Sequence, residues 1–393
     1  MSPSARVQAA IDILDLVVDA ARGSGPPADK IAADWFRTRR FAGSGDRRAV
    51  RELVYRAVRC CGEIPLGGRA AMLTLARGDA ALAALFDASP HSPAPIAEGE
   101  RYARPGLAPK WLEALLSASD IAGEEAETLL SRAPLDIRVN SLKAGRDALD
   151  LPVAAEPTLA RHGLRLPAGT QVEQWDAYLG GAIEIQDTAS QLACEVVAAQ
   201  PGETVIDLCA GAGGKTLALA AAMDNRGRLI ACDIDRQRLS QLVPRAARAG
   251  ATIIETQLLD PGREAAALGQ WQGKADAVLV DAPCSGSGTW RRNPEARWRL
   301  NAKGLERHVA SQAKLLEIGA ALVRPGGRLV YAVCSLLDGE GPDRIAAFLA
   351  RHGDWRADPP VLGAGRSRGS GIRLTPFHDG TDGFFVARML RLC

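Results

Sequence analysis

The chain is poor in the patterns from which metal sites and disulfide frameworks are built. Among its 393 residues are eight cysteines, none of them in a Cys-x-x-Cys pair, and five scattered histidines. In a chain of this length these patterns favour neither a zinc site nor a set of disulfides. We therefore expect reduced thiols, a cytoplasmic location and no bound metal.

The sequence also lacks long apolar runs and an excess of charge. No stretch reaches the ~18 uninterrupted apolar residues of a membrane span, and no basic segment followed by an apolar run opens the chain. A membrane protein is therefore not expected. The formal net charge is only +2, so a nucleic-acid surface would have to come from a local cluster of basic residues. We expect a monomer.

Three parts of the chain differ in their sequence pattern. Residues 1–130 read as helical, residues 131–185 as a small α+β module, and residues 186–393 as alternating strands and helices. This alternation predicts βαβ units and a mostly parallel sheet. The apolar stretch at 383–390 has no helix after it, which predicts an antiparallel last strand. Strands are expected at 205–206, 229–231, 253–254, 277–280 and 329–333, and helices at 216–223, 236–248, 306–323 and 343–351.

The densest basic cluster of the first third lies on a predicted helix from Arg47 to Val58, with Asp46 as its N-cap. Arg47 and Arg48 open this helix, and further arginines follow on its polar positions. The cluster can be a solvated helix face or a surface that binds phosphates, since nucleic-acid binders gather Lys and Arg on one face. Both alternatives stay open from the sequence.

A glycine-rich turn joins the first predicted strand of the last part to its helix, from Asp207 to Thr216. The ending Gly214-Lys215-Thr216 suggests a phosphate-binding loop, but that motif needs a glycine where Cys209 stands. The dinucleotide motif fails as well, because Thr216 stands in place of its third glycine. Asp233, at the end of the next strand, suits hydrogen bonds to ribose hydroxyls. The ligand therefore resembles a nucleoside without pyrophosphate, and S-adenosylmethionine fits.

Two cysteines follow two buried strands. Asp281 and Cys284 come after the apolar run 277–280, and Cys334 ends the run 329–333. One crossover separates the two strands, which usually makes them neighbours or near neighbours, so both thiols are expected at one crevice. Free cysteines are often only small core residues, and a buried acidic turn is the plain alternative.

A thiol, an acid and a methyl donor together suit methylation at C5 of a pyrimidine. The C5 carbon becomes nucleophilic once a thiolate has added to C6. An acid at N3/N4 can stabilise the charge that develops on the ring, and a base must then remove the C5 proton.

The chain resembles the Nop/Sun family of RNA (cytosine-5) methyltransferases, in particular its bacterial ribosomal-RNA branch. The resemblance runs from about Pro134 to Leu392, and the first third is similar to the antitermination-factor-like RNA-binding domain of that branch. It implies a Rossmann-like class I methyltransferase domain, S-adenosyl-L-methionine as cofactor and RNA, above all small-subunit ribosomal RNA, as partner. It is carried, in family order, by PLDIRVNSLK, GAIEIQDTASQL, DLCAGAGGKT, ACDIDRQRL, DAPCSGSGTWRRNPEARW, GGRLVYAVCS and DGFFVAR.

The resemblance also assigns roles to residues. It implies Cys334 as the nucleophile, Cys284 as the thiol that assists product release, and Asp281 as the acid that contacts the cytosine. It implies Asp233 as the ribose-binding acid, with Asp260 as a further cofactor acid. The glycine-rich loop departs from the family's usual Ala-Ala-Pro-Gly-Gly-Lys, and we expect at most somewhat weaker cofactor binding. The loop residues implied in cofactor binding are Cys209, Ala210, Gly211, Ala212, Gly213, Gly214 and Lys215.

A basic segment with tryptophans follows the first of the two cysteines. Arg291, Arg292 and Trp298 suit contacts with RNA phosphates and bases, and the alternative is a surface loop whose tryptophans anchor it to the core. Three other functions stay open for the whole chain. They are methylation of transfer RNA, RNA binding in ribosome assembly with dispensable catalysis, and a P-loop NTPase, against which Cys209 counts.

Overall fold

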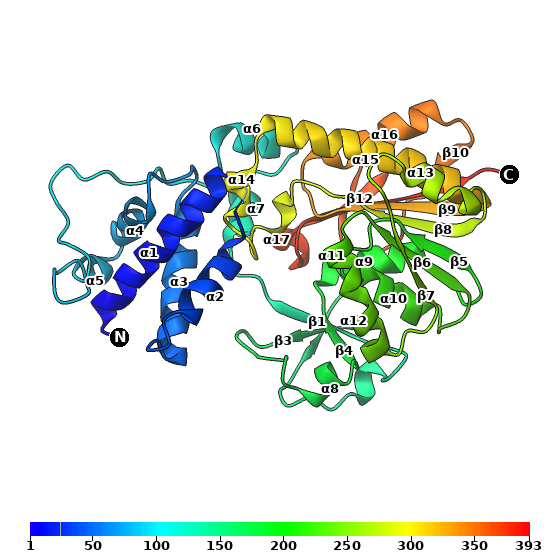
Figure 1. The fold of residues 1–393 in the computed structure, drawn as a ribbon. Coiled ribbons are helices and arrows are strands. Elements are labelled where there is room, and N and C mark those ends of the chain that lie inside the picture. Colours follow the sequence, from blue (N-terminus) through cyan, green and yellow to red (C-terminus); the bar gives the residue numbers. More distant parts are fainter. Residues whose placement is uncertain (24) are drawn as a thin grey trace. The chain divides into compact units, whose positions relative to one another are not determined.

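The structure, a computed structural model, describes residues 1–23 and 25–393 and contains two compact units. One unit comprises Met1–Ser131 together with Thr289–Asn301, and the other comprises Arg132–Gly288 together with Ala302–Cys393. Figure 1 shows the fold, with helices and strands labelled. The division into three domains stays a prediction, because the contacts join the small α+β module and the alternating region in one unit.

The first unit is helical, as the pattern of residues 1–130 predicted. Its longest helix, α1, buries Val7, Leu14 and Val18 on one side, and these residues belong to the core of the unit. Its helices are α1 (Pro3–Arg22), α2 (Ala28–Arg37), α3 (Ser44–Cys60), α4 (Gly68–Ala76), α5 (Ala80–Ala83), α6 (Lys110–Ala118), α7 (Gly123–Glu127) and α14 (Ala296–Arg299).

The predicted start of the helix that carries the arginine cluster is wrong by three residues. Helix α3 is preceded by Gly43, not by Asp46, which lies in its first turn. The Asp46 carboxylate accepts a hydrogen bond from the N–H of Gly43 at 3.3 Å and pairs with Arg6 at 2.9 Å. Asp46 thus accepts a hydrogen bond from the backbone N–H of the N-cap residue, Gly43, although it lies within the first turn of the helix.

The segment 289–301 belongs to the helical unit because its charged side chains complete two helix ends there. Glu295 accepts a hydrogen bond from the N–H of Ala28, the first residue of α2, at 2.9 Å. Arg297 donates to the carbonyls of Val58 and Cys61 at the end of α3, at 2.7 and 2.8 Å. An anion at a helix start and a cation at a helix end are both favourable there.

The second unit is built on a nine-stranded sheet with the order β11-β12-β13-β9-β8-β5-β6-β7, and β10 pairs with β13. The pairs from β9 to β7 are parallel, and β13 is antiparallel to β9, as predicted for the last strand. The strands are β5 (Thr204–Asp207), β6 (Arg228–Asp233), β7 (Ile254–Leu258), β8 (Ala275–Asp281), β9 (Val323–Val333), β10 (Trp355–Ala357), β11 (Arg366–Arg368), β12 (Gly371–Leu374) and β13 (Phe384–Arg391).

Helices cover both faces of this sheet (Figure 1). In β8, Ala277 and Leu279 pack into one core and Val278 and Val280 into the other, which is why the strand reads as a continuous apolar run. This confirms the predicted α/β fold with a mostly parallel sheet. The helices of the unit are α8 (Asp176–Leu179), α9 (Thr188–Val197), α10 (Gly214–Ala222), α11 (Arg236–Ser240), α12 (Leu242–Ala249), α13 (Glu264–Ala267), α15 (Ala302–Leu322), α16 (Pro342–Arg351) and α17 (Pro376–Asp379).

A smaller antiparallel sheet precedes the large one in the same unit, with the order β2-β3-β1-β4. It has an apolar core of its own, which includes Ile137, Val139 and Leu164. None of the helices in the described residues has the length and apolar character needed to cross a membrane. The strands of this sheet are β1 (Leu135–Val139), β2 (Glu156–Pro157), β3 (Gly163–Leu166) and β4 (Ile183–Ile185).

Candidate active site

The two cysteines predicted at neighbouring strand ends lie in contact. Strands β8 and β9 pair in parallel with Asp281 opposite Ala332, so the residues that follow them leave the sheet at the same edge. The Sγ atoms of Cys284 and Cys334 are 3.4 Å apart, and both cysteines are free thiols. The prediction that one crossover brings these strands side by side is confirmed.

The contact between the sulfurs changes the chemistry of Cys284. The hydrogen bond with Cys334, together with burial, raises the pKa of the Cys284 thiol well above its ordinary value. Cys284 therefore keeps its proton at neutral pH and can donate it in a hydrogen bond to the sulfur of Cys334.

A buried carboxyl group ties the two cysteine-bearing loops together. Glu340, which is fully buried, accepts hydrogen bonds from the N–H and the hydroxyl of Ser285 and, at 2.6 Å, from the hydroxyl of Ser335. Gln312 of α15 donates to the same carboxyl group at 3.1 Å and to the carbonyl of Pro283 at 3.0 Å. Because each serine directly follows one of the cysteines, this network fixes both sulfurs relative to one another.

Asp281 faces a lysine from the glycine-rich loop. The Nζ of Lys215 lies 2.6 Å from Oδ2 of Asp281, and the lysine side chain is 12% exposed. Burial alone would lower the pKa of Lys215, but the charge of Asp281 outweighs it and raises that pKa above its ordinary value. The lysine is therefore charged and holds the Asp281 carboxylate beside the cysteine pair.

The glycine-rich loop is shaped by backbone contacts. The N–H of Gly211 donates to Oδ2 of Asp233 at 2.7 Å, which joins the loop to the end of β6. Gly213 has a φ of +88°, and a Cβ built on it would lie 2.1 Å from Cδ1 of Leu242. A Cβ on Gly214 would meet nothing within 4 Å, so the loop leaves open space at its entry to α10.

A cavity of about 460 Å³ brings both predicted cysteines and three further predicted residues together, whereas residues 210–215 of the glycine-rich loop are not part of its lining. The lining includes the predicted cofactor residues Cys209 and Asp233 as well as Cys284 and Cys334, so the predicted cofactor site and the cysteine pair share one cavity. Asp260 does not line this cavity, because its side chain is exposed and the neighbouring Leu259 faces the cavity in its place. Of the predicted residues, the lining includes Cys209, Asp233, Asp281, Cys284 and Cys334.

Several residues of the site could not be predicted from the sequence. Lys314 of α15 lines the cavity and pairs with Glu264 of α13 at 2.7 Å. Gln312 of α15 and Glu340 of the segment before α16 hold the two cysteine loops. Their positions in the sequence carry no motif, and only the serine that follows each cysteine hinted at a shared partner.

The residues predicted to contact RNA lie in the helical unit. Arg48 is exposed and Arg47 is half-buried, with its Nε donating to the carbonyl of Ala42 at 2.9 Å. Arg291 is 5% exposed, and Arg292 is half-buried. Trp298 is buried in the core of the unit, and its indole N–H donates to the carbonyl of Cys61 at 3.1 Å. This position favours the anchoring alternative for Trp298.

Comparison with known proteins identifies the family. Residues 194–390 match the family model described as 16S rRNA methyltransferase RsmB/F. The chain is 34% identical over 314 residues to the probable ribosomal RNA small subunit methyltransferase B of Synechocystis, a match that covers 75% of this chain and 68% of that protein. Across the curated relatives that we compared, the match spans between 50% and 68% of the relative's length.

Solved structures agree with the sequence comparison. The structure of PH0851 superposes with a TM-score of 0.76 at 26% identity and covers 99% of both chains. The methyltransferase homolog protein from Pyrococcus horikoshii has a TM-score of 0.61 at 27% identity and covers 73% of this chain and 96% of that one. The fold is thus that of Rossmann-like methyltransferases. The chain belongs to the RsmB/F family of 16S rRNA methyltransferases.

Proposed function

We propose that the protein methylates C5 of a cytosine in small-subunit ribosomal RNA, with S-adenosylmethionine as the methyl donor and Cys334 as the nucleophile. The observation that carries the proposal is the pair of sulfurs 3.4 Å apart, beside an aspartate held by a lysine. Two thiols in contact have no use in simple methyl transfer, whereas C5 methylation needs a nucleophile and a base.

The cavity suits S-adenosylmethionine. Asp233 stands at the end of β6, where an acid can bind the hydroxyls of a ribose. The acids that line the cavity, Asp233, Asp235 and Asp281, suit a ligand with a positive sulfonium group. When bound, S-adenosylmethionine supplies an electrophilic methyl group. The relative NSun6 from Pyrococcus horikoshii, whose structure is described as being with SFG, shares the fold at 19% identity.

The addition step uses Cys334. Its thiolate, stabilised by the proton of Cys284, adds to C6 of the cytosine, so that an S–C6 bond forms and the electron pair of the C5–C6 double bond becomes available at C5. Asp281, fixed by Lys215, contacts the N3/N4 edge of the ring and stabilises the charge that develops there. C5 can then take up the methyl group.

The release step uses Cys284. Once Cys334 is a thioether, it is a poor hydrogen-bond partner, so the largest cause of the raised Cys284 pKa disappears. Cys284 can then lose its proton to water and accept the C5 proton, while the S–C6 bond breaks and Cys334 leaves as a thiolate. This restores the starting state, in which Cys284 donates its proton to the sulfur of Cys334.

Ribosomal RNA as the substrate rests on the relatives, which are named ribosomal RNA small subunit methyltransferase B. The helical unit carries the exposed Arg48 and three arginines that lie over aromatic rings, at 4.0 Å for Arg39 and at 5.8 and 5.5 Å for Arg47 and Arg51. Such arginines lose little entropy when they bind phosphate, because the rings already restrict them.

The test is a denaturing gel of radiolabelled ribosomal RNA incubated with cofactor and reductant. We expect Cys284→Ala to accumulate a slowly migrating RNA–protein adduct, because release is blocked, and Cys334→Ala to form neither adduct nor product. Cys393→Ala, which removes an exposed thiol outside the cavity, is the matched control and should behave as wild type. If both cavity variants still methylate RNA and neither traps it, the covalent mechanism is wrong. Exchanged behaviour would reverse the two roles.

A further inference from the structure

One face of β1 and of the residue that follows it carries three buried polar side chains, and only one of them lacks a full set of partners. Asp136 pairs with Arg165 at 2.7 Å and accepts from the Thr188 hydroxyl at 2.7 Å. Asn140 donates to the carbonyls of Gly181 and Ala249 at 2.9 and 2.8 Å. Between them lies Arg138. Because side chains alternate between the two faces of a strand, Arg138 points to the same face as Asp136 and Asn140.

Arg138 is a buried cation, and its cross-strand neighbour Glu184 is already paired with Arg245 and Arg248. It is 5% exposed, and its Nε donates to Oε1 of Gln186 at 2.7 Å. Within the part of the chain that the structure describes, it forms no ion pair, and its two terminal NH₂ groups have no hydrogen-bond partner. Burial lowers the pKa of Arg138 from its ordinary value. A buried charge without a partner is costly, so this arrangement indicates a ligand that supplies one.

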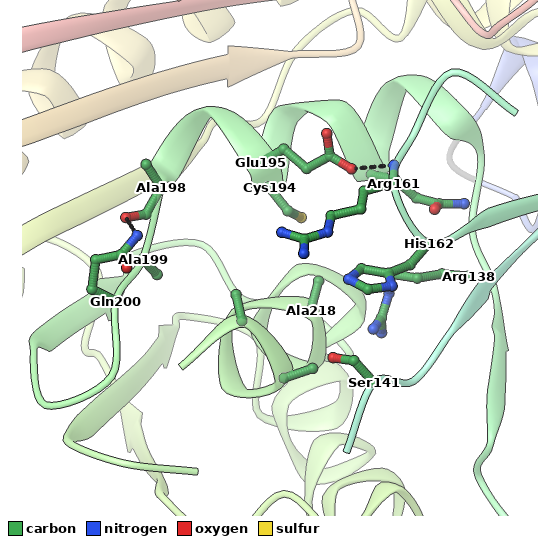
Figure 2. A pocket seen from close by; sticks show the side chains of 13 residues that line it. Arg138, Ser141, Arg161, His162, Cys194, Glu195, Ala198, Ala199, Gln200 and Ala218 are labelled. Atoms are coloured by element: carbon green, nitrogen blue, oxygen red, sulfur yellow. Dashed lines mark hydrogen bonds between the residues drawn. The ribbon is translucent and has the colours of Figure 1, made fainter. Parts of the chain in front are cut away.

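Arg138 lines a cavity of about 270 Å³ between the small sheet, α9 and the second half of α10 (Figure 2). In Figure 2 the side chains of Arg161 and His162, from the turn before β3, reach into the same cavity. Neither side chain has a hydrogen bond to a described residue. Opposite them the wall is small and apolar, made by Ala218 and its neighbours on α10.

The other groups of the cavity leave this positive charge uncompensated. Burial raises the pKa of the Cys194 thiol to about 12, so Cys194 is neutral. Glu195 also lines the cavity, but its Oε1 accepts the backbone N–H of Arg161 at 2.7 Å. Burial and the charges of Arg161 and Arg138 lower the pKa of His162, which therefore offers a neutral N–H donor. Two guanidinium groups and one imidazole thus face a single acid.

We propose that this cavity is a phosphate-binding site, in which Arg138, Arg161 and His162 donate hydrogen bonds to the oxygens of one phosphate group. Guanidinium groups match phosphate oxygens in geometry and keep their charge when buried. The phosphate can belong to the backbone of an RNA or to a free phosphate or mononucleotide, and both sources offer the same oxygens.

The site is separate from the methyltransferase cavity. Helix α10 begins at the cofactor loop with Gly214 and contributes Ala218, Ala221 and Ala222 to the phosphate site. At 1.5 Å per residue, Ala218 lies about 6 Å and Ala222 about 12 Å along the helix from Gly214, and none of the described residues lines both cavities. A phosphate bound there would not occupy the cavity beside Cys334, and it would anchor RNA or a small ligand on a second surface of the unit.

The first experiment titrates inorganic phosphate into the full-length protein by calorimetry, and the second measures binding of a ribosomal RNA fragment over a range of salt concentrations. We expect phosphate binding in the wild type that is lost in Arg161→Gln and in Arg138→Gln. For RNA we expect weaker binding, with the slope of log affinity against log salt reduced by about 0.7 to 0.9 for the lost contact. Arg356→Gln, an exposed arginine on β10, is the matched control.

The outcomes separate the two sources. Loss of phosphate binding together with the change in salt slope assigns the site to RNA. Loss of phosphate binding with an unchanged slope assigns it to a free phosphate or mononucleotide. If wild type binds no phosphate and Arg161→Gln leaves the slope unchanged, the proposal is overturned. Only the RNA arm rests on the proposed function, and cofactor affinity, expected to be unchanged in Arg161→Gln, reports that the unit is folded.

Discussion

The two halves of the methyltransferase cavity are held in different ways. The cysteine half is fixed by side chains, because Ser285, Ser335 and Gln312 all donate to the buried carboxyl group of Glu340. In the cofactor half, side chains instead hold the backbone of the loop, and Arg245 donates to the carbonyl of Ala212 at 2.6 Å. There Gly211 bonds Asp233 through its N–H, and Gly213 adopts a left-handed conformation against Leu242.

This difference matches what each half must do. A nucleophile and a base work only at fixed separation, and a closed hydrogen-bond network holds the sulfurs 3.4 Å apart. A cofactor must enter and leave, and a loop that Asp233 and Arg245 hold at single backbone groups keeps its other backbone N–H groups and room for the ligand. Changes to the cysteine half should therefore lower both the free energy of unfolding and the rate of adduct formation. Changes to the cofactor half should be able to lower cofactor affinity without lowering the free energy of unfolding.

The largest effect is expected for Glu340→Ala. The change leaves the hydroxyls of Ser285 and Ser335 without their acceptor in a buried site, which costs about 3 kcal/mol or more in the free energy of unfolding. It also frees the cysteine loops, so that adduct formation should fall in the gel assay. Urea denaturation and the yield of adduct in a Cys284→Ala background measure the two effects.

Glu340→Gln separates packing from hydrogen bonding in this test. Its amide keeps the volume but replaces one acceptor oxygen by a donor, so an intermediate loss is expected. Glu317→Ala is the control, since this half-exposed glutamate pairs with Arg351 at 2.8 Å on the surface and its removal should cost less than about 1 kcal/mol. An adduct yield unaffected by either Glu340 change would show that the network does not position the sulfurs.

The sequence predicted the fold well where one physical signal dominated. The runs 277–280 and 329–333 are buried on both faces, so their apolar character identified them as strands, and the single crossover between them predicted that they are neighbours. The segment 289–301 was assigned to the methyltransferase domain because it lies within it in the sequence. Its place in the helical unit depends on the contacts of Arg297 and Trp298 with carbonyls near Cys61, which are distant in sequence.

Within the site, the residues that follow strand ends could be predicted, and those that support them could not. Cys284, Cys334 and Asp233 share one cavity because parallel strands end at one edge. Asp260 also follows a strand, yet the chain turns so that Leu259 enters the cavity in its place. Glu340 precedes α16 and reaches the cysteine loops only through the tertiary fold, so no spacing rule identifies it.

A second prediction concerns how the stability of the fold depends on pH through Asp207, which ends β5 where the cofactor loop begins. Burial raises the pKa of this carboxyl group to about 7, although it accepts a hydrogen bond from Thr216 at 2.7 Å. Between about pH 4 and about pH 7 the folded state holds a proton that the unfolded state has lost, so stability falls as the pH rises through this range. The expected fall is a few kcal/mol.

Asp207→Asn should remove this part of the pH dependence, because asparagine does not titrate. Denaturant midpoints of wild type and variant across the same pH range measure it. Asp276→Asn is the control: hydrogen bonds with Thr204 and Arg324 outweigh its burial and lower the pKa of Asp276, so its contribution is lost only in more acidic solution. Equal pH profiles for wild type and Asp207→Asn would refute the assignment.

The smallest effect on stability, and the sharpest contrast, is expected for the two glycines that end the cofactor loop. Gly213→Ala places a Cβ 2.1 Å from Leu242 on a residue with a φ of +88°, which should cost about 2 kcal/mol in the free energy of unfolding. Gly214→Ala meets nothing within 4 Å at the first residue of α10, so stability should be kept or slightly raised.

Cofactor binding then separates the two variants in a second way. Gly214 belongs to the loop implied in cofactor binding, so Gly214→Ala should weaken S-adenosylmethionine binding in calorimetry while the protein stays as stable as wild type. Gly213→Ala should weaken it through the distorted loop, in step with its loss of stability. If Gly214→Ala bound the cofactor as wild type does, the ligand would not lie against this part of the loop, and the cofactor half would be organised by the acids at the strand ends instead.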